Sequence, residues 1–312
     1  MPGVRPWLCD RHCLRHDGRR REGRHGGSQH KAGSARGRCI HDTQRKTGEE
    51  VMKYDFKMVA VGPVSHGAFS DGIDTGNAML FRRMTVITPD GAPVKVPAIS
   101  GNALRGVMRR ILTREIFYRL GLRGKADELY IAMANGGALG KTLDTYIYPE
   151  KIAAVRELVP MLSVFGGALY TYMLPGRAGV SFATLECLEA GTGPLRISDL
   201  TEDIGLTRHL DRTEVLTPED VKPMPYTIEA VVKGAVFDFS VWTDDYATDL
   251  EKACLFHALK RLSHIGGKSA AGFGEISIDG IPDDSAYIDW LETRDQAYAD
   301  SLVEYSKGMA KC

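Results

Sequence analysis

The sequence lacks a long apolar run, because no stretch of its 312 residues reaches the roughly 18 apolar residues of a membrane-spanning helix. No apolar segment follows the basic residues near its start, so we expect no signal peptide. Its six cysteines are scattered and form no disulfide framework, as in proteins of a reducing compartment. We therefore expect a cytoplasmic protein without a membrane partner, long enough to bury a sizeable core.

Net charge is also absent, since 40 Lys and Arg balance 40 Asp and Glu, but the charges are unevenly placed. Residues 1–51 carry twelve basic and six acidic residues, a net of +6, so the remainder carries −6. The segment 276–312 has eight acids and three bases. This polarity is compatible with head-to-tail contact between copies of the chain and equally with a solvated acidic tail.

Residues 1–51 are rich in Arg, Gly and His, show no hydrophobic period, and are expected to be disordered. We interpret them as an upstream extension, a tag or a misassigned start, or alternatively as a basic arm that adds non-specific RNA affinity. A group of Cys and His lies there, but its spacing matches no closed zinc site, so we expect no metal and no cofactor. The group consists of Cys9, His12, Cys13 and His16.

The stretch 97–114 predicts an amphipathic helix with Ser100 as its N-cap. Its apolar stripe consists of Leu104, Val107, Met108, Ile111 and Leu112. Arginines follow both flanks at i,i+4 spacing, Arg105 with Arg109 and Arg110 with Arg114. This pattern predicts a helix with one buried face and two cationic rows.

The start of this helix has little bulk, because Ser100, Gly101 and Ala103 are small. The open N–H groups of a first helical turn are a ready anion site. Residues 81–125 carry ten Lys and Arg against two acids, the expected footprint of a phosphate-bearing partner. Taken alone, the pattern of this helix is also explained by an ordinary amphipathic helix with solvated arginines. The clustering of positive charge around it favours binding of a sugar-phosphate chain.

The order of expected elements is strand, helix, strands, helix, strand, which fits the split βαβ arrangement of ferredoxin-like folds. We expect strands at 53–61, 84–88, 180–189, 229–242 and 275–279, helices at 100–120 and 249–264, and an acidic terminal helix. Residues 121–175 read as an insertion of small helices, and the polar stretch around 197–226 as a projecting excursion. The predicted fold class is α+β, with one domain over residues 52–312.

A second glycine-rich stretch, 266–274, follows a helix and precedes a strand. It contains Gly-Lys-Ser, but a nucleotide-binding loop would need a glycine where Leu262 stands and the reverse order of elements, so we exclude nucleoside triphosphate binding. A glycine segment with one lysine lets a backbone pass near RNA, and Phe273 offers a ring for stacking on a base. The alternative is a flexible turn with Phe273 in the core.

These two stretches resemble the helix start and the late glycine-rich loop of the CRISPR-associated RAMP superfamily. Further similar pieces occur in the same order over most of residues 52–280: Gly72-Ile73-Asp74, Phe165-Gly166-Gly167 and Leu210-Asp211-Arg212-Thr213. The sequence is most similar to the backbone subunits of guide-RNA effector complexes, those of type IV first and type III next.

The resemblance implies an RRM-like sheet with insertions, and copies of the chain aligned head to tail along a CRISPR guide RNA. It implies that the helix start and the glycine loop line one crevice that grips the guide while base pairing reads the target nucleic acid. The residues that it assigns to RNA binding are Ser100, Gly101, Asn102, Arg105, Arg109, Arg110, Gly266, Gly267, Lys268, Ser269 and Phe273. The excursion corresponds to a thumb hairpin, with Arg208, His209, Leu210 and Arg212 as its working residues. Other effector subunits are further expected partners.

Two enzymatic alternatives stand beside this binding role. Asp74 lies where type III relatives carry an aspartate that supports target-RNA cleavage, but the residues after it depart from their pattern. His66 is a candidate for the acid–base chemistry of guide-processing endoribonucleases, with no obvious partner in sequence. His257 is expected to be a satisfied core residue. Binding without chemistry is the preferred interpretation.

Overall fold

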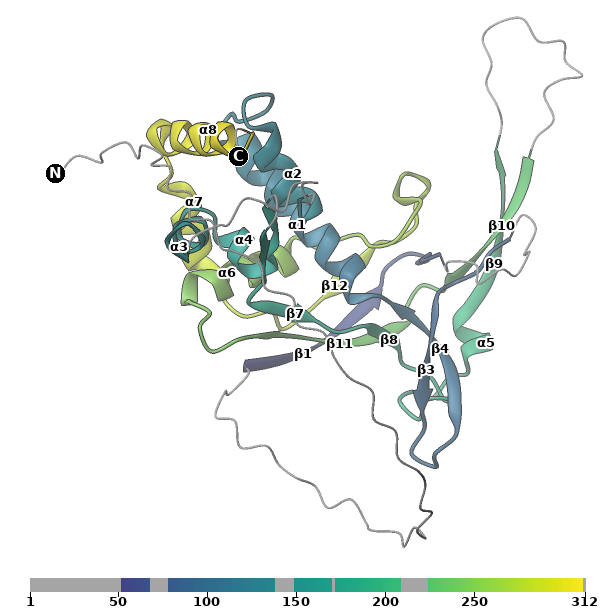
Figure 1. Cartoon of the computed structure of the whole chain (residues 1–312). Helices are drawn as coiled ribbons and strands as arrows, with labels where there is room; N and C mark the ends of the chain where they lie inside the picture. The colour runs from purple at the N-terminus through teal and green to yellow at the C-terminus, as the bar shows by residue number, and fades with distance from the viewer. Residues whose placement is uncertain (1–51, 68–77, 138–148, 170–171, 209–223, 311–312) are drawn as a thin grey trace, which may run out of the picture. The chain divides into compact units, whose positions relative to one another are not determined.

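The computed structural model describes residues 52–67, 78–137, 149–169, 172–208 and 224–310. These residues form a mixed α+β fold in which helices lie against an antiparallel sheet (Figure 1). The order of strands in the sheet is β12-β1-β11-β8-β4-β3, and β7 also pairs with β11. Its strands are β1 (Met52–Ala60), β3 (Arg83–Ile87), β4 (Pro93–Ile99), β7 (Ala178–Val180), β8 (Ala183–Leu185), β11 (Val236–Thr243) and β12 (Ile276–Ile278).

Strands β1 and β11 form the longest ladder of this sheet, from Met52↔Thr243 to Val59↔Val236. Both alternate apolar and polar residues, so one face of the ladder carries Phe56, Met58, Phe237 and Phe239, all buried. The opposite face carries charged and hydroxyl side chains together with Trp242. The strand expected at 53–61 is confirmed, within one residue at each end.

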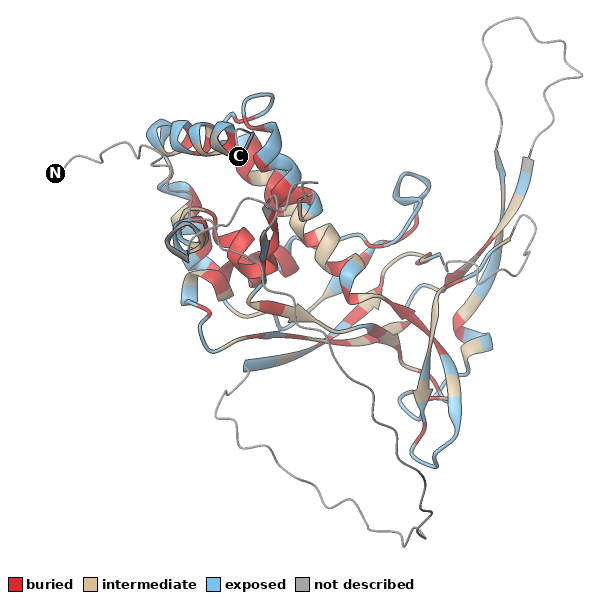
Figure 2. Cartoon of the chain, viewed as in Figure 1, coloured by how far each residue is buried: buried red, intermediate tan, exposed pale blue. Residues whose placement is uncertain are grey.

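Helices α1 (Gly101–Arg119) and α6 (Asp249–Lys260) pack on the apolar face of the sheet. Helix α1 buries Leu104, Met108, Leu112 and Ile116, close to the predicted stripe. Helix α6 begins in a capping box between Thr248 and Glu251. Figure 2 shows the buried residues concentrated where helices and sheet meet. This contact between layers forms the core.

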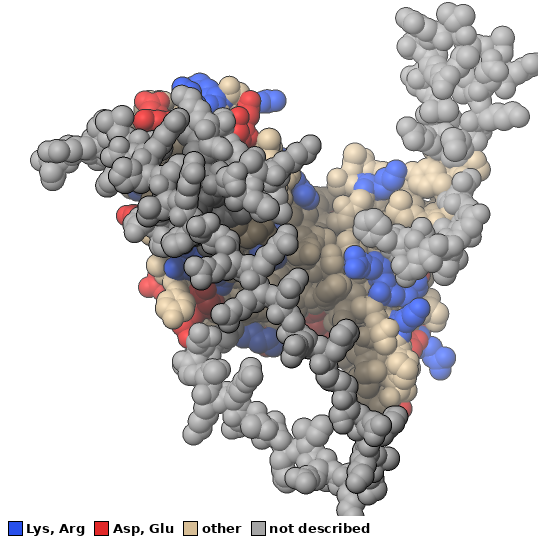
Figure 3. All heavy atoms as spheres, viewed as in Figure 1, with Lys and Arg blue, Asp and Glu red and all other residues tan. Residues whose placement is uncertain are grey.

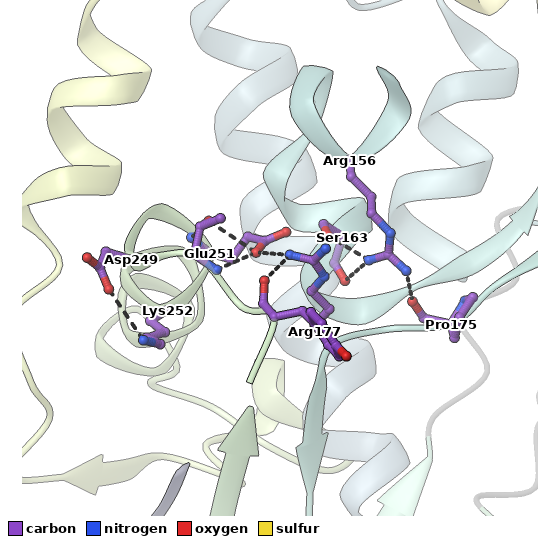
Figure 4. Close-up of polar contacts among 9 residues, drawn as sticks. Arg156, Ser163, Pro175, Arg177, Asp249, Glu251 and Lys252 are labelled. Atoms are coloured by element: carbon purple, nitrogen blue, oxygen red, sulfur yellow. Dashed lines mark hydrogen bonds and ion pairs between the residues drawn. The ribbon is translucent and has the colours of Figure 1, made fainter. Parts of the chain in front are cut away.

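The insertion expected at 121–175 consists of short helices and one small hairpin. They are α2 (Asp127–Asn135), α3 (Pro149–Leu158), α4 (Pro160–Phe165), β5 (Gly167–Leu169) and β6 (Tyr172–Leu174). Arginines hold the helices of the insertion together and fix the segment that follows it, where the Arg177 N–H also donates to the Ser163 carbonyl over 3.0 Å (Figure 4). Arg156 donates to Ser163 Oγ over 2.8 Å, and Arg177, just before β7, pairs with Glu251 of α6 over 2.8 Å. Helix α4 of the insertion packs against α6 and contacts β7 of the sheet.

The excursion contains an antiparallel hairpin. Helix α5 (Ile197–Leu200) leads into β9 (Thr201–Arg208), which pairs with β10 (Met224–Val231) from Thr201↔Val231 to Arg208↔Met224. A short strand, β2 (Ala78–Met79), adds to β10 in parallel. The residue pattern alone did not predict these strands, because a hairpin that projects from the sheet need not alternate cleanly. The resemblance implied a hairpin over about 197–226, and a hairpin is present there.

Four elements differ from the sequence expectations. Strand β4 directly precedes α1 and was not expected, since Pro93 and Pro97 argue against a strand. The strand expected at 180–189 is divided into β7 and β8, and the one expected at 229–242 into β10 and β11. The terminal helix is two helices, α7 (Ser285–Glu292) and α8 (Gln296–Ala310). No helix in the described ranges has the length and apolar character to cross a membrane.

Candidate nucleic-acid interface

The start of α1 has the cap that the sequence predicts. Ser100 is extended and its Oγ accepts a hydrogen bond from the Ala103 N–H over 3.2 Å. Gly101 is buried against the carbonyl oxygens of Val180 and Ser181, and a Cβ at this position would collide with both. The backbone that Gly101 admits is therefore β7 and the residue after it. Asn102, one position on, is exposed.

The glycine loop 266–274 is held by close backbone contacts. Gly266 and Gly274 have φ of 84° and 86°, and a Cβ on either would collide with a carbonyl oxygen, of Ser65 and Ile265 respectively. Lys268 is the single non-glycine residue with positive φ, 63°, in the part of the chain that the structure describes. This tight, left-handed path leaves the Lys268 side chain exposed.

One dipeptide connects the helix start with the glycine loop. The Ser65 carbonyl accepts a hydrogen bond from the Gly267 N–H over 3.1 Å, and His66 Nε2 lies 3.5 Å from the Ser100 backbone nitrogen, which donates to it. We call this arrangement of Ser65, His66, Ser100 and the loop the His66 junction. It places the two glycine-bearing segments side by side, as the sequence analysis expects of a shared binding surface.

Strand β10 of the hairpin contacts the glycine loop of this junction. Lys268 Nζ lies 5.1 Å from the centre of the Tyr226 ring on β10, a cation–π distance. Glu229, also on β10, accepts hydrogen bonds from the Phe81 N–H over 2.8 Å and from Arg83. The hairpin is thus tied both to the glycine loop and to the start of β3.

Electrostatics around the junction favour an anionic partner. Burial and the nearby Arg82 charge lower the pKa of His66 below its ordinary value, so the ring is neutral and its Nε2 is free to accept from Ser100. Figure 3 shows Lys and Arg side chains gathered over β3, β4 and the hairpin base. Lys95 is exposed there, whereas the charge of Arg83 is paired with Glu229. The positive charge at the junction therefore comes from Arg82 and Lys268, while Lys95 lies further along β4.

Arg105 and Arg109 are not free cations on the flank of α1. Arg105 donates to the Phe165 carbonyl over 2.7 Å, and Arg109 donates to the carbonyls of Phe165 and Gly166, the latter over 2.7 Å. Burial and the charge of Arg105 lower the pKa of Arg109 to about 10. Both side chains hold the C-terminal end of α4, where the helix dipole favours cations. The expectation that they extend toward a ligand is corrected by these contacts, while Arg110 is exposed.

The expectation that Phe273 offers its ring for stacking on a base is also corrected. Its side chain is 3% exposed and packs with Ile228 and Ala230 of β10, so its ring does not face a base. The alternative interpretation, a turn with Phe273 in the core, is the one that the structure bears out. The ring attaches the glycine loop to the hairpin and leaves Lys268 as the exposed side chain of that loop.

Several predicted residues lie outside the described ranges: Asp74, His209, Leu210 and Arg212, together with the Cys and His group of residues 1–51. Of the thumb residues only Arg208 is placed, as the last residue of β9. Ser269 begins a short 3-10 turn and is exposed. In the part of the chain that is described, no group of three His, Cys, Asp or Glu side chains is placed to hold a metal ion.

Sequence reasoning missed the contributions of Arg82 and Tyr226 to this surface, and weighed His66 only as a catalyst. Arg82 and Tyr226 lie on segments whose pairing depends on contacts more than 100 residues away in the chain, such as that between Phe81 and Glu229. One sequence signal could have indicated that His66 lies near the edge of the sheet, namely its position shortly after the strand predicted over 53–61. A tight turn can bring such a residue back over the sheet edge, but the sequence gives no partner for it.

Similarity to known proteins is visible in the fold. No protein-family model and no curated protein sequence matches the chain. A subunit in a structure described as a Type IV-B CRISPR complex has the same fold, with a TM-score of 0.52 and 21% identity over 78% of this chain and 100% of that one. The crystal structure of Thermofilum pendens Csc2 aligns with a TM-score of 0.40 and 16% identity, over 83% and 77% of the two chains. The resemblance inferred from the motifs is thus confirmed at the level of the fold.

Proposed function

We propose that this chain is a backbone subunit of a CRISPR effector complex that binds the guide RNA, multimerises head to tail along it and holds the guide–target duplex. The observation that carries the proposal is the His66 junction, in which one dipeptide contacts both the α1 start and the glycine loop. Other effector subunits are the expected partners at the ends of such an assembly.

An RRM-like, ferredoxin-like core is part of the proposal. The strand order β12-β1-β11-β8, with α1 after β1 and α6 after β11, supports it, because split βαβ units give a central pair of strands flanked by the other two. On the β1–β11 ladder the polar face carries Asp55, Lys57 and Asp238, with Trp242 as its one aromatic side chain, whereas RRM domains stack two or three bases on several rings of their sheet. We therefore place the guide at the His66 junction instead of on the sheet.

The hairpin β9–β10 fits the role of a thumb. It projects from the sheet (Figure 1), and strand β10 is fixed by Glu229 and by the contact of Tyr226 with Lys268. The segment of sequence between the two strands contains His209, Leu210 and Arg212, which we propose to meet the guide–target duplex. Because base pairing reads sequence in such a complex, the protein needs to recognise only shape and phosphates.

The proposal is tested by counting copies of the chain on single-stranded RNA. Mass photometry of the full chain with RNAs of increasing length is expected to show complexes that grow by one subunit per fixed increment of RNA. Affinity is expected to fall steeply with salt and to depend little on sequence. One copy per RNA regardless of length would contradict the backbone role, even if binding itself were tight.

Target-RNA cleavage by Asp74 is the second candidate. The residues on either side of its loop are anchored beside the junction, since Gly67 bridges to Phe81 and β2 pairs with β10. A carboxylate delivered there would lie near a splayed phosphate, where it can hold a metal ion or orient the attacking hydroxyl. Cleavage at regular spacing that disappears in Asp74→Ala would support this function, and cleavage that survives the substitution would remove Asp74 from it.

A further inference from the structure

The far end of α1 carries a second cationic surface, distinct from the His66 junction. Arg114, Tyr118, Arg119 and Arg123 are all exposed, and we call this set the α1 ridge. Tyr118 follows Ser100 by about 27 Å along the helix axis, at about 1.5 Å per residue. Figure 1 shows this end of α1 rising away from the sheet toward α2 and α8. The ridge therefore lies beyond the reach of a ligand confined to the junction.

Open grooves run along both sides of the ridge. One, of about 900 Å³, is lined by Arg114, Tyr118 and Arg119 of α1 and by Lys260 and Arg261 at the end of α6. The other, of about 610 Å³, is lined by Arg114 and Tyr118 together with Arg123 and residues of α2. Arg114 and Tyr118 are one turn apart and belong to both grooves.

The arginines of the ridge are not neutralised by ion pairs with described residues of the chain. Arg114, Arg119 and Arg123 make no ion pair with any residue that the structure describes. The acids nearby are engaged: Glu115 bonds His257 over 2.9 Å, and Asp284 bonds both His257 and Lys260. Asp127, at the start of α2, is the one acid that lines the second groove. A net positive field is left over the ridge.

Tyr118 gives this surface a second character. Its side chain is 93% exposed, whereas Phe117 beside it is 5% exposed and packs edge-on against Tyr130. A fully exposed aromatic ring between guanidinium groups is the combination used to bind single strands, with a base stacked on the ring and phosphates at the cations. An acidic peptide would satisfy the arginines but would leave the ring without a partner.

We propose that the α1 ridge binds a single strand of nucleic acid, separate from the strand held at the His66 junction. The strand stacks a base on Tyr118 and places its phosphates toward Arg114, Arg119 and Arg123. This site does not require guide binding, so it stands or falls independently of the function proposed above.

The test compares three variants of the full chain with labelled oligothymidylate and oligouridylate, which separate DNA from RNA. Every chain in this comparison also carries Lys268→Glu, which weakens binding at the junction, so that binding at the ridge is measured. The ridge variant adds Arg114→Gln, Tyr118→Ala and Arg119→Gln, and is expected to bind about tenfold more weakly than Lys268→Glu alone, with a salt slope smaller by about 1.4 for two lost phosphate contacts. The matched control adds Lys53→Gln with Lys233→Gln, which removes the same charge from β1 and from the β10–β11 turn, and is expected to bind like Lys268→Glu alone. An unchanged melting temperature in the ridge variant confirms its fold.

Crosslinking then locates the strand. A bromouracil-substituted strand is expected to form an adduct on the tryptic peptide that contains Tyr118, and the adduct is expected to persist in Lys268→Glu, which disturbs the junction alone. Unchanged affinity in the ridge variant, or adducts confined to the junction, would overturn the proposal. Retained strand affinity with lost binding of polyglutamate would also overturn it and would assign the ridge to an acidic protein.

Discussion

Helix α1 carries two rows of arginine with the same spacing, one bonded to the protein backbone and the other exposed to solvent. Arg105 and Arg109 turn inward and hold the carbonyls at the end of α4, whereas Arg110 and Arg114 are exposed. The same contrast, between a residue engaged by the chain and a like residue left open, separates Gly266 from Gly272. His257 and His66 are both held by the chain and differ in what holds them, two carboxylates for His257 and the Ser100 N–H for His66. The contrast within α1 shows that residue type and spacing locate a cationic helix, but that the neighbouring backbone decides which cations meet a ligand.

The largest effect expected from this comparison is on stability. Arg109→Glu would place a carboxylate against two carbonyl oxygens and remove charged hydrogen bonds, so we expect a loss of at least about 3 kcal/mol in the free energy of unfolding. The matched change Arg110→Glu, on the exposed row, is expected to cost less than about 0.5 kcal/mol. Urea denaturation measures both, and equal losses would erase the distinction between the rows.

The two glycines give a sharper version of the same contrast. Both have positive φ, 84° at Gly266 and 85° at Gly272, but a Cβ on Gly266 would collide with the Ser65 carbonyl, and one on Gly272 would meet nothing within 4 Å. We expect Gly272→Ala to cost about 1 kcal/mol, the penalty of a left-handed alanine, and Gly266→Ala to cost clearly more. Thermal unfolding of the two variants provides the comparison. A smaller loss in Gly266→Ala would mean that the loop is not pinned to Ser65.

The histidines test the comparison through pH. Burial opposes the charge on His257, but hydrogen bonds to Glu115 and Asp284 outweigh it and raise its pKa, whereas burial and Arg82 lower the pKa of His66. The stabilisation from His257 is complete below its unfolded pKa of about 6.5 and is lost as pH rises through the raised folded value. For His66 the sign is opposite, and stability is lost as pH falls through the lowered folded value.

An NMR titration of the two imidazoles measures this difference directly. We expect His257 to titrate above about 6.5 and His66 below it. His257→Gln is expected to abolish the loss of stability toward high pH and to leave the loss toward low pH in place. Both rings titrating near their ordinary value would show that neither is held as the structure places it.

The sequence was sufficient for elements with strong local signals. The Ser100 cap and the apolar stripe of α1 follow from a capping residue and a regular period, and β1 from its alternation. It was insufficient where a distant partner decides the outcome. Arg105 meets a carbonyl 60 residues later, and Phe273 packs on a hairpin strand more than 40 residues earlier. No local pattern distinguishes such a buried arginine or phenylalanine from an exposed one.

The central claim is that one RNA strand crosses the His66 junction and contacts both the α1 start and the glycine loop. Fluorescence anisotropy of labelled single-stranded RNA with the full chain tests it most directly in Asn102→Glu, Lys268→Glu and, as control, Lys233→Glu, each made in a chain that also carries the ridge substitutions so that the ridge does not bind the RNA. The account predicts that the first two each weaken binding by about tenfold and lower its salt dependence, while the control binds like the chain with the ridge substitutions alone. Unchanged affinity in Lys268→Glu together with Asn102→Glu would contradict it.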